Sequence, residues 1–261
     1  PLLRFYSTNS HETLIGLEEY VKRMPKNQDK IYYALGHSLD DAKASPYLKS
    51  VTKQGFEVLL SGDEIEHLMF SRLPAYKYKR EDEESERSYY FEEIGQESHG
   101  NDELQSENRN ATIEFEPVCE LFSKTLGNSK VQSVNVNVRL KDSGVPCAIA
   151  QGAFAMSPAF ERMMRAQAVA SGQSQPEPIP KVLELNPEHS AILTLLSMTK
   201  DGEMNSHLTQ ELEPMINTMF QTAVLRAGFE LFEIPSYVQS IDSLIEEKAA
   251  RLKELYPPSD A

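Results

Sequence analysis

The chain has 261 residues, of which 40% are hydrophobic and 25% are charged, and its formal net charge is −14. This length and balance fit one large or two ordinary soluble domains. The acidity excludes a general nucleic-acid binder, because such a protein needs a basic face to replace the counterions on phosphates. No run of 18 or more apolar residues occurs, so no membrane-spanning helix is expected.

The two cysteines, Cys119 and Cys147, are both flanked by apolar residues. No CxxC pair occurs, and two cysteines alone cannot hold a zinc ion. Buried, reduced thiols are favoured over a disulfide, and they favour a reducing compartment. No basic segment followed by an apolar segment is present, so no signal peptide is expected.

The first 80 residues alternate short apolar runs with helical patterns of apolar residues. The patterns predict helices over 13–24, 45–55 and 63–73, and strands over 30–36 and 56–62. Strand and helix alternate with short connections, which indicates a small parallel sheet with helices packed on it. We therefore expect residues 1–80 to form one small α/β unit.

An acidic stretch follows this unit. Residues 81–107 contain eleven acidic residues and one basic residue, Arg87, and show little apolar periodicity. Such a composition is typical of a solvated linker or mobile segment. We expect residues 81–112 to form that linker, with some helix possible.

The pattern changes in residues 113–261. A helix is predicted over 113–126, with Gly127 as its end, and strict alternation over 131–140 predicts a half-buried strand. The turn residues at 141–144 lead into another apolar run at 146–150, so the two runs are expected to pair as a hairpin. A strand over 181–185 and a helix that is capped by Asn186 and starts at Pro187 come next.

Two long helices are predicted at the end, over 208–227 and 236–255, with Pro214 either starting or kinking the first. Two wide apolar stripes cannot both be buried within one helical hairpin. Pairing with a second copy would give a four-helix bundle, whereas packing on the preceding layer is the alternative. The residues expected at the dimer interface are Met215, Met219, Phe220, Val224, Tyr237, Val238, Ile241, Leu244 and Ile245.

The segment GAFAMSPAFERMMRAQA, residues 152–168, is rich in methionine and phenylalanine. A helix starting at Ser157 would place positions 160, 163, 164 and 167 on one face. Stripes of this kind are core more often than not, but methionine also suits a surface that repacks against many partners. The residues of such a surface would be Phe154, Met156, Phe160, Met163 and Met164.

Motifs for catalysis were sought and not found. The sequence contains no GxGxxG after a strand, no GxxxxGK[ST], no HExxH and no GxSxG. Glu64 and His67 share a helix face, but two ligands without a third do not make a metal site. His189, beside Glu188, suits a contact at a helix start better than catalysis. We expect no catalytic residue and no metal site in this chain.

Several segments, in order, resemble one family. EPVCELFSKTLGNSKVQSVNVNVRLKDSGVPCAIA, MSPAFERMMRAQA, LELNPEHSAI and MFQTAVLRAGFELFEIPSYVQSIDSLI resemble the C-terminal domain of the heat-shock protein 90 chaperones, which are ATP-driven homodimers. LLRFYSTNSHETLIGLEEYVKRMPKNQDKIYYALG and SPYLKSVTKQGFEVLLSGDEIEHLMFSRL resemble the end of the family's middle domain. Only residues 75–112 lack a clear counterpart.

The resemblance implies a fragment of an α+β (α/β) protein: the end of a middle domain over 1–80 and a dimerisation domain over 113–261. The family's nucleotide-binding domain and its ATP-contacting arginine would lie before Pro1. ATP and magnesium are therefore expected outside this chain, and no cofactor is expected within it.

The implied partners are a second copy of the chain and unfolded or partly folded clients, with no nucleic acid and no membrane. In the family, the segment corresponding to 152–168 is an exposed amphipathic helix facing the cleft between protomers, which favours the surface interpretation of the methionines. The end, YPPSDA, is similar to mitochondrial or bacterial members, whereas MPKNQDKIYY is similar to cytosolic ones. A stand-alone dimeric scaffold that binds no client is the alternative function.

Overall fold

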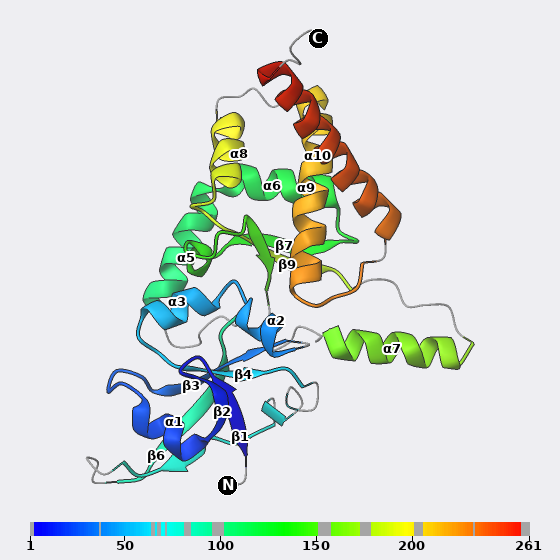
Figure 1. Ribbon diagram of the computed structural model, residues 1–261. Helices are drawn as coiled ribbons and strands as arrows, with labels where there is room; N and C mark the ends of the chain where they lie inside the picture. The colour runs from blue at the N-terminus through cyan, green and yellow to red at the C-terminus, as the bar shows by residue number, and fades with distance from the viewer. Residues whose placement is uncertain are drawn as a thin grey trace.

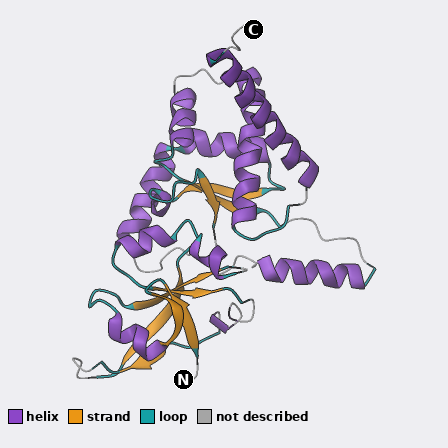
Figure 2. Ribbon diagram, viewed as in Figure 1, coloured by secondary structure: helices purple, strands orange, loops and turns teal. Residues whose placement is uncertain are grey.

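The structure is a computed structural model. It describes residues 3–36, 38–63, 66, 69–70, 72–80, 85–95, 102–150, 158–172, 179–200, 206–231 and 233–256. The chain has the expected α+β fold, in which two β-sheets, each accompanied by helices, follow one another along the chain (Figure 1, Figure 2).

The first sheet has six strands in the order β2-β1-β4-β3-β6-β5. Its strands are β1 (Arg4–Ser7), β2 (Ser10–Gly16), β3 (Lys30–Leu35), β4 (Val58–Ser61), β5 (Tyr76–Tyr78) and β6 (Arg87–Glu93). The helices of this unit are α1 (Leu17–Arg23), α2 (Leu39–Lys43) and α3 (Leu48–Lys53). β3 pairs with β4 in parallel, as predicted for these two strands. The sheet as a whole is mixed and not parallel as expected, because β1 pairs antiparallel with β2 and β4, and β5 pairs antiparallel with β6. Five of the eleven residues in the helix predicted over 63–73 lie outside the described residues, and positions 66, 69 and 70 are helical.

The helix predicted over 13–24 is wrong in its first part. Residues up to Gly16 form strand β2, and the helix begins at Leu17. Ile15 is 2% exposed whereas Leu14 is 48% exposed, so burial alternates here as it does in a strand. Pairing with β1 satisfies the backbone of this segment, and this pairing cannot be read from helical spacing.

The acidic stretch also differs from the expected linker. Residues 87–93 form β6, which pairs in parallel with β3 inside the first sheet, and residues 102–114 form helix α5 (Asp102–Glu114). Tyr89 is fully buried in the core of the first unit although acidic residues surround it in the sequence. Residues 87–93 therefore form an interior strand of the first sheet, between β3 and β5, despite the acidic residues around them.

The second sheet has three strands in the order β7-β9-β8. The elements beside α5 are α6 (Glu116–Leu126), β7 (Val131–Val136), the 3₁₀ helix η1 (Val138–Leu140), β8 (Cys147–Ile149) and β9 (Lys181–Leu185). The expected hairpin is wrong, because β9 lies between β7 and β8 and pairs with both. Leu183 and Leu185 on β9 are fully buried, as suits the central strand of a sheet.

Four helices complete the second unit. They are α7 (Pro158–Ala170), α8 (Ser190–Lys200), α9 (Ser206–Arg226) and α10 (Ile234–Leu255). α8 begins at Ser190 and not at Pro187. The Asn186 side chain accepts a hydrogen bond from the backbone N–H of Glu188 at 3.0 Å and donates to the Leu140 carbonyl at 2.8 Å, so it holds a turn before the helix. α9 continues through Pro214.

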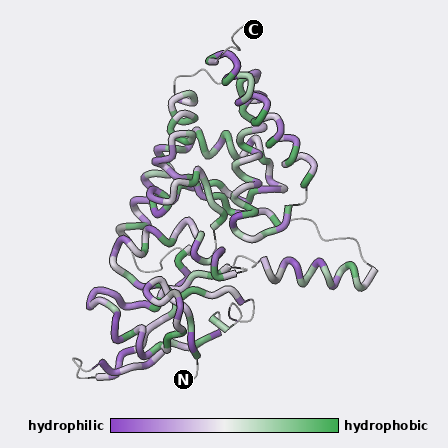
Figure 3. The backbone as a smooth tube through the Cα atoms, in the orientation of Figure 1, coloured by the Kyte–Doolittle hydropathy of each residue, from purple (hydrophilic) through white to green (hydrophobic). Residues whose placement is uncertain are grey.

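The two units share a hydrophobic cluster. Leu140 and Ala148 of the second unit pack in one cluster with Val58 and Leu60 of β4. Apolar stretches fill both sheets, and they also recur along α7 and α10 (Figure 3). The apolar residues of the sheets form the core. Those of α7 and α10 form the candidate functional surfaces.

Candidate functional site

Helix α7 is attached to its neighbours by charged side chains. Glu161 forms an ion pair with Lys181 at the start of β9, and the two side chains are only 11% and 12% exposed. The Lys181 ammonium also lies 3.8 Å from the centroid of the Phe229 ring. Burial lowers the pKa of Lys181, and the Glu161 carboxylate opposes that shift.

Two arginines on the same face of α7 make further contacts. Arg162 donates a hydrogen bond to the carbonyl oxygen of Gly228 at 3.2 Å, and Arg165 forms an ion pair with Glu230. Positions 161, 162 and 165 fall on one side of a helix, so the charged side of α7 faces the protein. Figure 1 shows α7 near the lower end of α9.

The opposite side of α7 is apolar and exposed. Met163 is 54% exposed and Met164 is 42% exposed. A surface helix of a globular protein normally turns its apolar face inward and its charged face outward, and α7 does the reverse. Core packing therefore does not explain these two methionines.

The rest of the predicted methionine surface is only partly placed. Phe154 and Met156 lie outside the described residues. Phe160 belongs to α7, but its side chain is not among those described. Glu161, Arg162 and Arg165 are interleaved with these residues in the sequence and carry the attachment of α7. The sequence assigned them no role, although their helical spacing was a usable signal for the attached side.

The predicted interface residues on α9 lie within the core of their own unit. Phe220 and Val224 are 7% and 6% exposed, and Met215 and Met219 pack against the same cluster. This cluster also contains residues of α6, α8 and all three strands of the second sheet. On these four positions, the structure agrees with packing on the preceding layer.

Helix α10 is different, because none of its residues is buried. Lys130, which precedes β7, pairs with Glu233 at 3.1 Å and donates to Asn217 Oδ1 at 3.2 Å, and these contacts hold the start of α10 against α9. Tyr237 and Ile241 are half-buried, whereas the other large apolar side chains are exposed. These exposed residues are Ile234, Val238, Leu244, Ile245, Leu252 and Leu255.

The junction between the two units contains a buried polar network. Tyr47, before α3, donates a hydrogen bond to Glu184 Oε2 on β9, and Asn137 donates to the same oxygen at 2.8 Å. Burial and the neighbouring Glu184 carboxylate raise the pKa of Tyr47. Each partner is buried, so the network fixes the position of β9 relative to the first unit.

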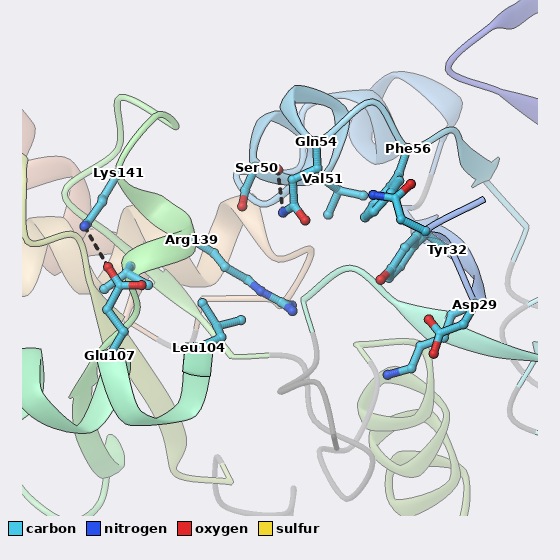
Figure 4. Close-up of a pocket in the computed structure, with 13 residues that line it drawn as sticks. Asp29, Tyr32, Ser50, Val51, Gln54, Phe56, Leu104, Glu107, Arg139 and Lys141 are labelled. Carbon is cyan, nitrogen blue, oxygen red and sulfur yellow. Dashed lines mark hydrogen bonds and ion pairs between the residues drawn. The ribbon is translucent and has the colours of Figure 1, made fainter. Parts of the chain in front are cut away.

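A cavity of about 490 Å³ lies at the same junction (Figure 4). Its labelled side chains come from β3, α3, α5 and η1 and from residues that flank β3, α3 and η1. Lys141 forms an ion pair with Glu107 at 3.1 Å, and Arg139 extends between the two walls. Tyr32 stacks on Phe56 with ring centroids 5.5 Å apart. The cavity is polar and its carboxylate at Glu107 is already paired.

The structure also bears on the two cysteines, on possible metal ligands and on possible membrane-spanning helices. Cys119 and Cys147 are buried and free, as expected, and burial raises their pKa values to about 11 and about 12. In the described part of the chain, no three acidic, histidine or cysteine side chains form a group that could hold a metal ion. Of the helices described, none has the length and apolarity needed to cross a membrane.

Comparison with known proteins gives consistent matches along the chain. The family described as "Hsp90 protein" matches residues 1–257. "Heat shock protein 90-5, chloroplastic" of Arabidopsis thaliana is 32% identical over 230 residues, which cover 88% of this chain and 27% of that protein. "Chaperone protein HtpG" of Wolbachia pipientis wMel is 31% identical over 245 residues, which cover 94% of this chain and 36% of that protein.

The fold and its surfaces define an α+β module that closes with a helical hairpin, whose last helix has an exposed apolar face. The matches, which extend over most of the chain, name its family. The chain belongs to the Hsp90 protein family, and it spans about a third of the length of the curated relatives it matches or less.

Proposed function

We propose that this chain is the dimerising and client-contacting part of an Hsp90-type molecular chaperone that assists protein folding. Membership of the family supports the chaperone role, and one of the relatives is named a chaperone protein. ATP and magnesium have no assigned residue in this proposal, because nucleotide binding is expected in other parts of a longer protein.

The dimer proposal is supported by α10. Four of its exposed apolar positions, 234, 238, 245 and 252, follow one another at steps of four, seven and seven residues, which is the spacing of a helix that packs along another helix. A single chain leaves this face in water, and pairing with the same helix of a second copy would cover it.

The packing of α9 removes four residues from the expected dimer interface. Met215, Met219, Phe220 and Val224 stabilise the hairpin from within their own unit, so they position α10 and do not themselves meet the partner in this proposal. The contact is assigned to the outer face of α10. Its members from the predicted set are Val238 and Ile245, whereas Leu244, which follows Tyr237 by seven residues, lies with Tyr237 and Ile241 at the border to α9.

The client proposal is supported by the reversed polarity of α7. Its methionines are exposed because the charged side of the helix makes the attachment. A thioether side chain is flexible and polarisable, so it can adapt to apolar segments of many shapes. This outward apolar face is the single observation that carries the client-contacting role.

The test replaces both methionines, as Met163→Ser with Met164→Ser, and measures how far the chain suppresses aggregation of a chemically unfolded reporter protein. The affinity for the reporter is expected to fall by about 30-fold, and suppression with it, since two contacts of roughly 1 kcal/mol each are lost. The mass in sedimentation and the thermal midpoint are expected to stay unchanged, because both side chains are exposed.

The control replaces two exposed apolar residues elsewhere, Ile113→Ser with Leu193→Ser, which are 70% and 45% exposed. This variant is expected to suppress aggregation like the unmodified chain. Equal suppression by the methionine variant would contradict the client-contacting role, and a dimer without any suppression would favour the scaffold function instead.

A further inference from the structure

A groove of about 570 Å³ lies beside the free edge of the second sheet. Its walls are the end of α5, the outer side of α6 and strand β7. Glu116, Glu120 and Ser123 line it from α6, at the spacing of one side of a helix. None of its described lining residues belongs to α7 or α10, so the groove is separate from the methionine face and from the dimer contact.

The backbone of β7 points alternately toward β9 and away from it. Asn137, just after the strand, donates its N–H to the carbonyl oxygen of Leu185 on β9 at 3.1 Å. Val136 faces the other way, and its N–H donates to Oγ1 of Thr112 on α5 at 3.0 Å. β9 is the only strand beside β7 in this sheet, so alternate residues of β7 turn their N–H and C=O groups to a free edge.

Val134 lies two residues before Val136, so its backbone faces the same free edge, and it lines the groove. Thr112 accepts from the N–H of Val136, but within the described part of the chain no side chain accepts from the N–H of Val134. An edge of this kind is a template for a further strand. An extended peptide that adds such a strand is a recurring mode of peptide recognition.

The charge of the groove favours a cationic segment. Glu120 pairs with Lys124 at 3.1 Å, whereas Glu116 forms no ion pair with any described residue. The chain as a whole carries a formal net charge of −14. A lysine or arginine on the added strand would therefore find a carboxylate at Glu116 and an attractive field around it.

We propose that this groove binds a short extended segment of a partner protein, which pairs with Val134 as an added strand and places a lysine or arginine beside Glu116. An extended segment has backbone N–H and C=O groups to offer, whereas a helix has already used its own. Thr112 holds the edge at Val136, so the segment lies against the part of β7 that precedes it. Backbone bonds supply the affinity, and the cation supplies the preference.

Binding is measured on the full chain by fluorescence anisotropy. The probe is a labelled heptapeptide of valine and threonine with a central lysine, a glycine at each end and both ends blocked. It is expected to saturate with a Kd on the order of 0.1 mM, as suits a short strand that must be ordered on binding.

Two further peptides have the same charge and carry N-methyl groups on alternate residues, so that each blocks one of the two rows of N–H groups. Only one row of an added strand faces β7. One methylated peptide is therefore expected to bind at least about tenfold more weakly, and the other to bind normally. Attraction between charges alone would not distinguish the two.

Hydrogen exchange locates the contact. At a peptide concentration of ten times Kd, exchange of the Val134 amide is expected to slow about tenfold. The Val136 amide is bonded to Thr112 with and without peptide, so its exchange is expected to stay unchanged.

Glu116→Gln removes the carboxylate and is expected to weaken the peptide about threefold. Glu213→Gln makes the same change at an exposed position of α9 and is expected to bind normally. Ser123→Trp, which fills the groove from α6, is expected to abolish binding. Unfolding midpoints show whether each variant is folded, and Glu116→Gln carries the test if Ser123→Trp is not.

The proposal is overturned if the unmethylated peptide does not saturate, or if both methylated peptides bind equally. Protection of the Val134 amide that rises with protein concentration in the absence of peptide would assign the edge to a second copy, which also overturns it. Sedimentation mass and aggregation suppression of Glu116→Gln are expected to be normal, so the groove is tested independently of the dimer and of the methionine face.

Discussion

Among single residues, Tyr47 connects the two units directly. Its hydroxyl donates to the buried Glu184 carboxylate, which Asn137 also contacts. Tyr47→Phe would leave that carboxylate with fewer donors in a buried site. A free-energy loss of roughly 1.5–3 kcal/mol is expected in urea unfolding, as for other hydrogen bonds to charged groups.

The matched control for this substitution is Tyr90→Phe. Tyr90 is 65% exposed on β6, so loss of its hydroxyl is expected to change the free energy of unfolding by less than about 0.5 kcal/mol. If Tyr47→Phe unfolds at the same urea concentration as this control, the buried network does not stabilise the junction.

The two thiols give a second prediction at the residue scale. Raised pKa values of about 11 for Cys119 and about 12 for Cys147 keep both thiols protonated at pH 8. Alkylation of the native chain at pH 8 is expected to be slower than alkylation of the urea-unfolded chain by about 100-fold or more. Native rates equal to unfolded rates would show that the thiols are accessible.

The same raised pKa values of the two thiols predict that the free energy of unfolding falls at alkaline pH. The folded state holds these protons above the unfolded thiol pKa, so the unfolded chain releases them first as pH rises. The stabilisation is therefore complete below about pH 8.5 and declines from there up to the folded values of about 11 and about 12.

At the scale of elements, the orientation of α7 determines which of its side chains are exposed to a client. Glu161 and Lys181 form its least exposed ion pair. Glu161→Ala would leave the Lys181 ammonium half-buried without its carboxylate, and release of α7 would relieve that cost. Trypsin is expected to cut at Arg162 and Arg165 about tenfold faster in this variant, since release exposes both residues.

Glu120→Ala is the control for the trypsin experiment, because Glu120 pairs with Lys124 on the exposed surface of α6. Removal of an exposed pair has little effect on stability, so cleavage within α7 is expected to keep its normal rate. Equal cleavage of α7 in the Glu161→Ala and Glu120→Ala variants would mean that the ion pair does not hold the helix.

The sequence predicted elements well where local signals decide them. Strands β3 and β4, the stop of α3 near Gly55 and both closing helices follow from apolar spacing and glycine positions, and Gly55 has a φ of +82° that suits its role. The errors involve partners distant in sequence. β2 needs β1, β6 needs β3, and β9 separates β7 from β8.

For the candidate surfaces too, local spacing predicts the apolar stripes, but contacts distant in sequence determine which stripes are exposed. Helical spacing identified the apolar stripes of α9 and α10. Only the fold shows that the stripe of α9 packs in the core of its own unit, whereas the outer face of α10 is exposed. For Met163 and Met164, composition allowed both core and surface. The ion pairs of Glu161 and Arg165 decide which side of α7 faces the protein.

At the scale of the whole molecule, the two units are joined by a common hydrophobic cluster and by the Tyr47 network. The first unit and the second sheet therefore pack together into one body, to which α7 and α10 are attached. In the proposed dimer, α10 of one copy contacts α10 of the other, and each copy has an α7 whose methionines are exposed. The exposed face of α10 is the feature on which this arrangement depends.

Sedimentation equilibrium of the full chain at micromolar concentration tests this claim most directly. The unmodified chain is expected to sediment at twice its 29.5 kDa. Ile245→Asp, which places a charge on the outer face of α10, is expected to give the single mass, and Ser243→Asp, on the opposite side of the helix, the double mass. A single mass for the unmodified chain would contradict the account.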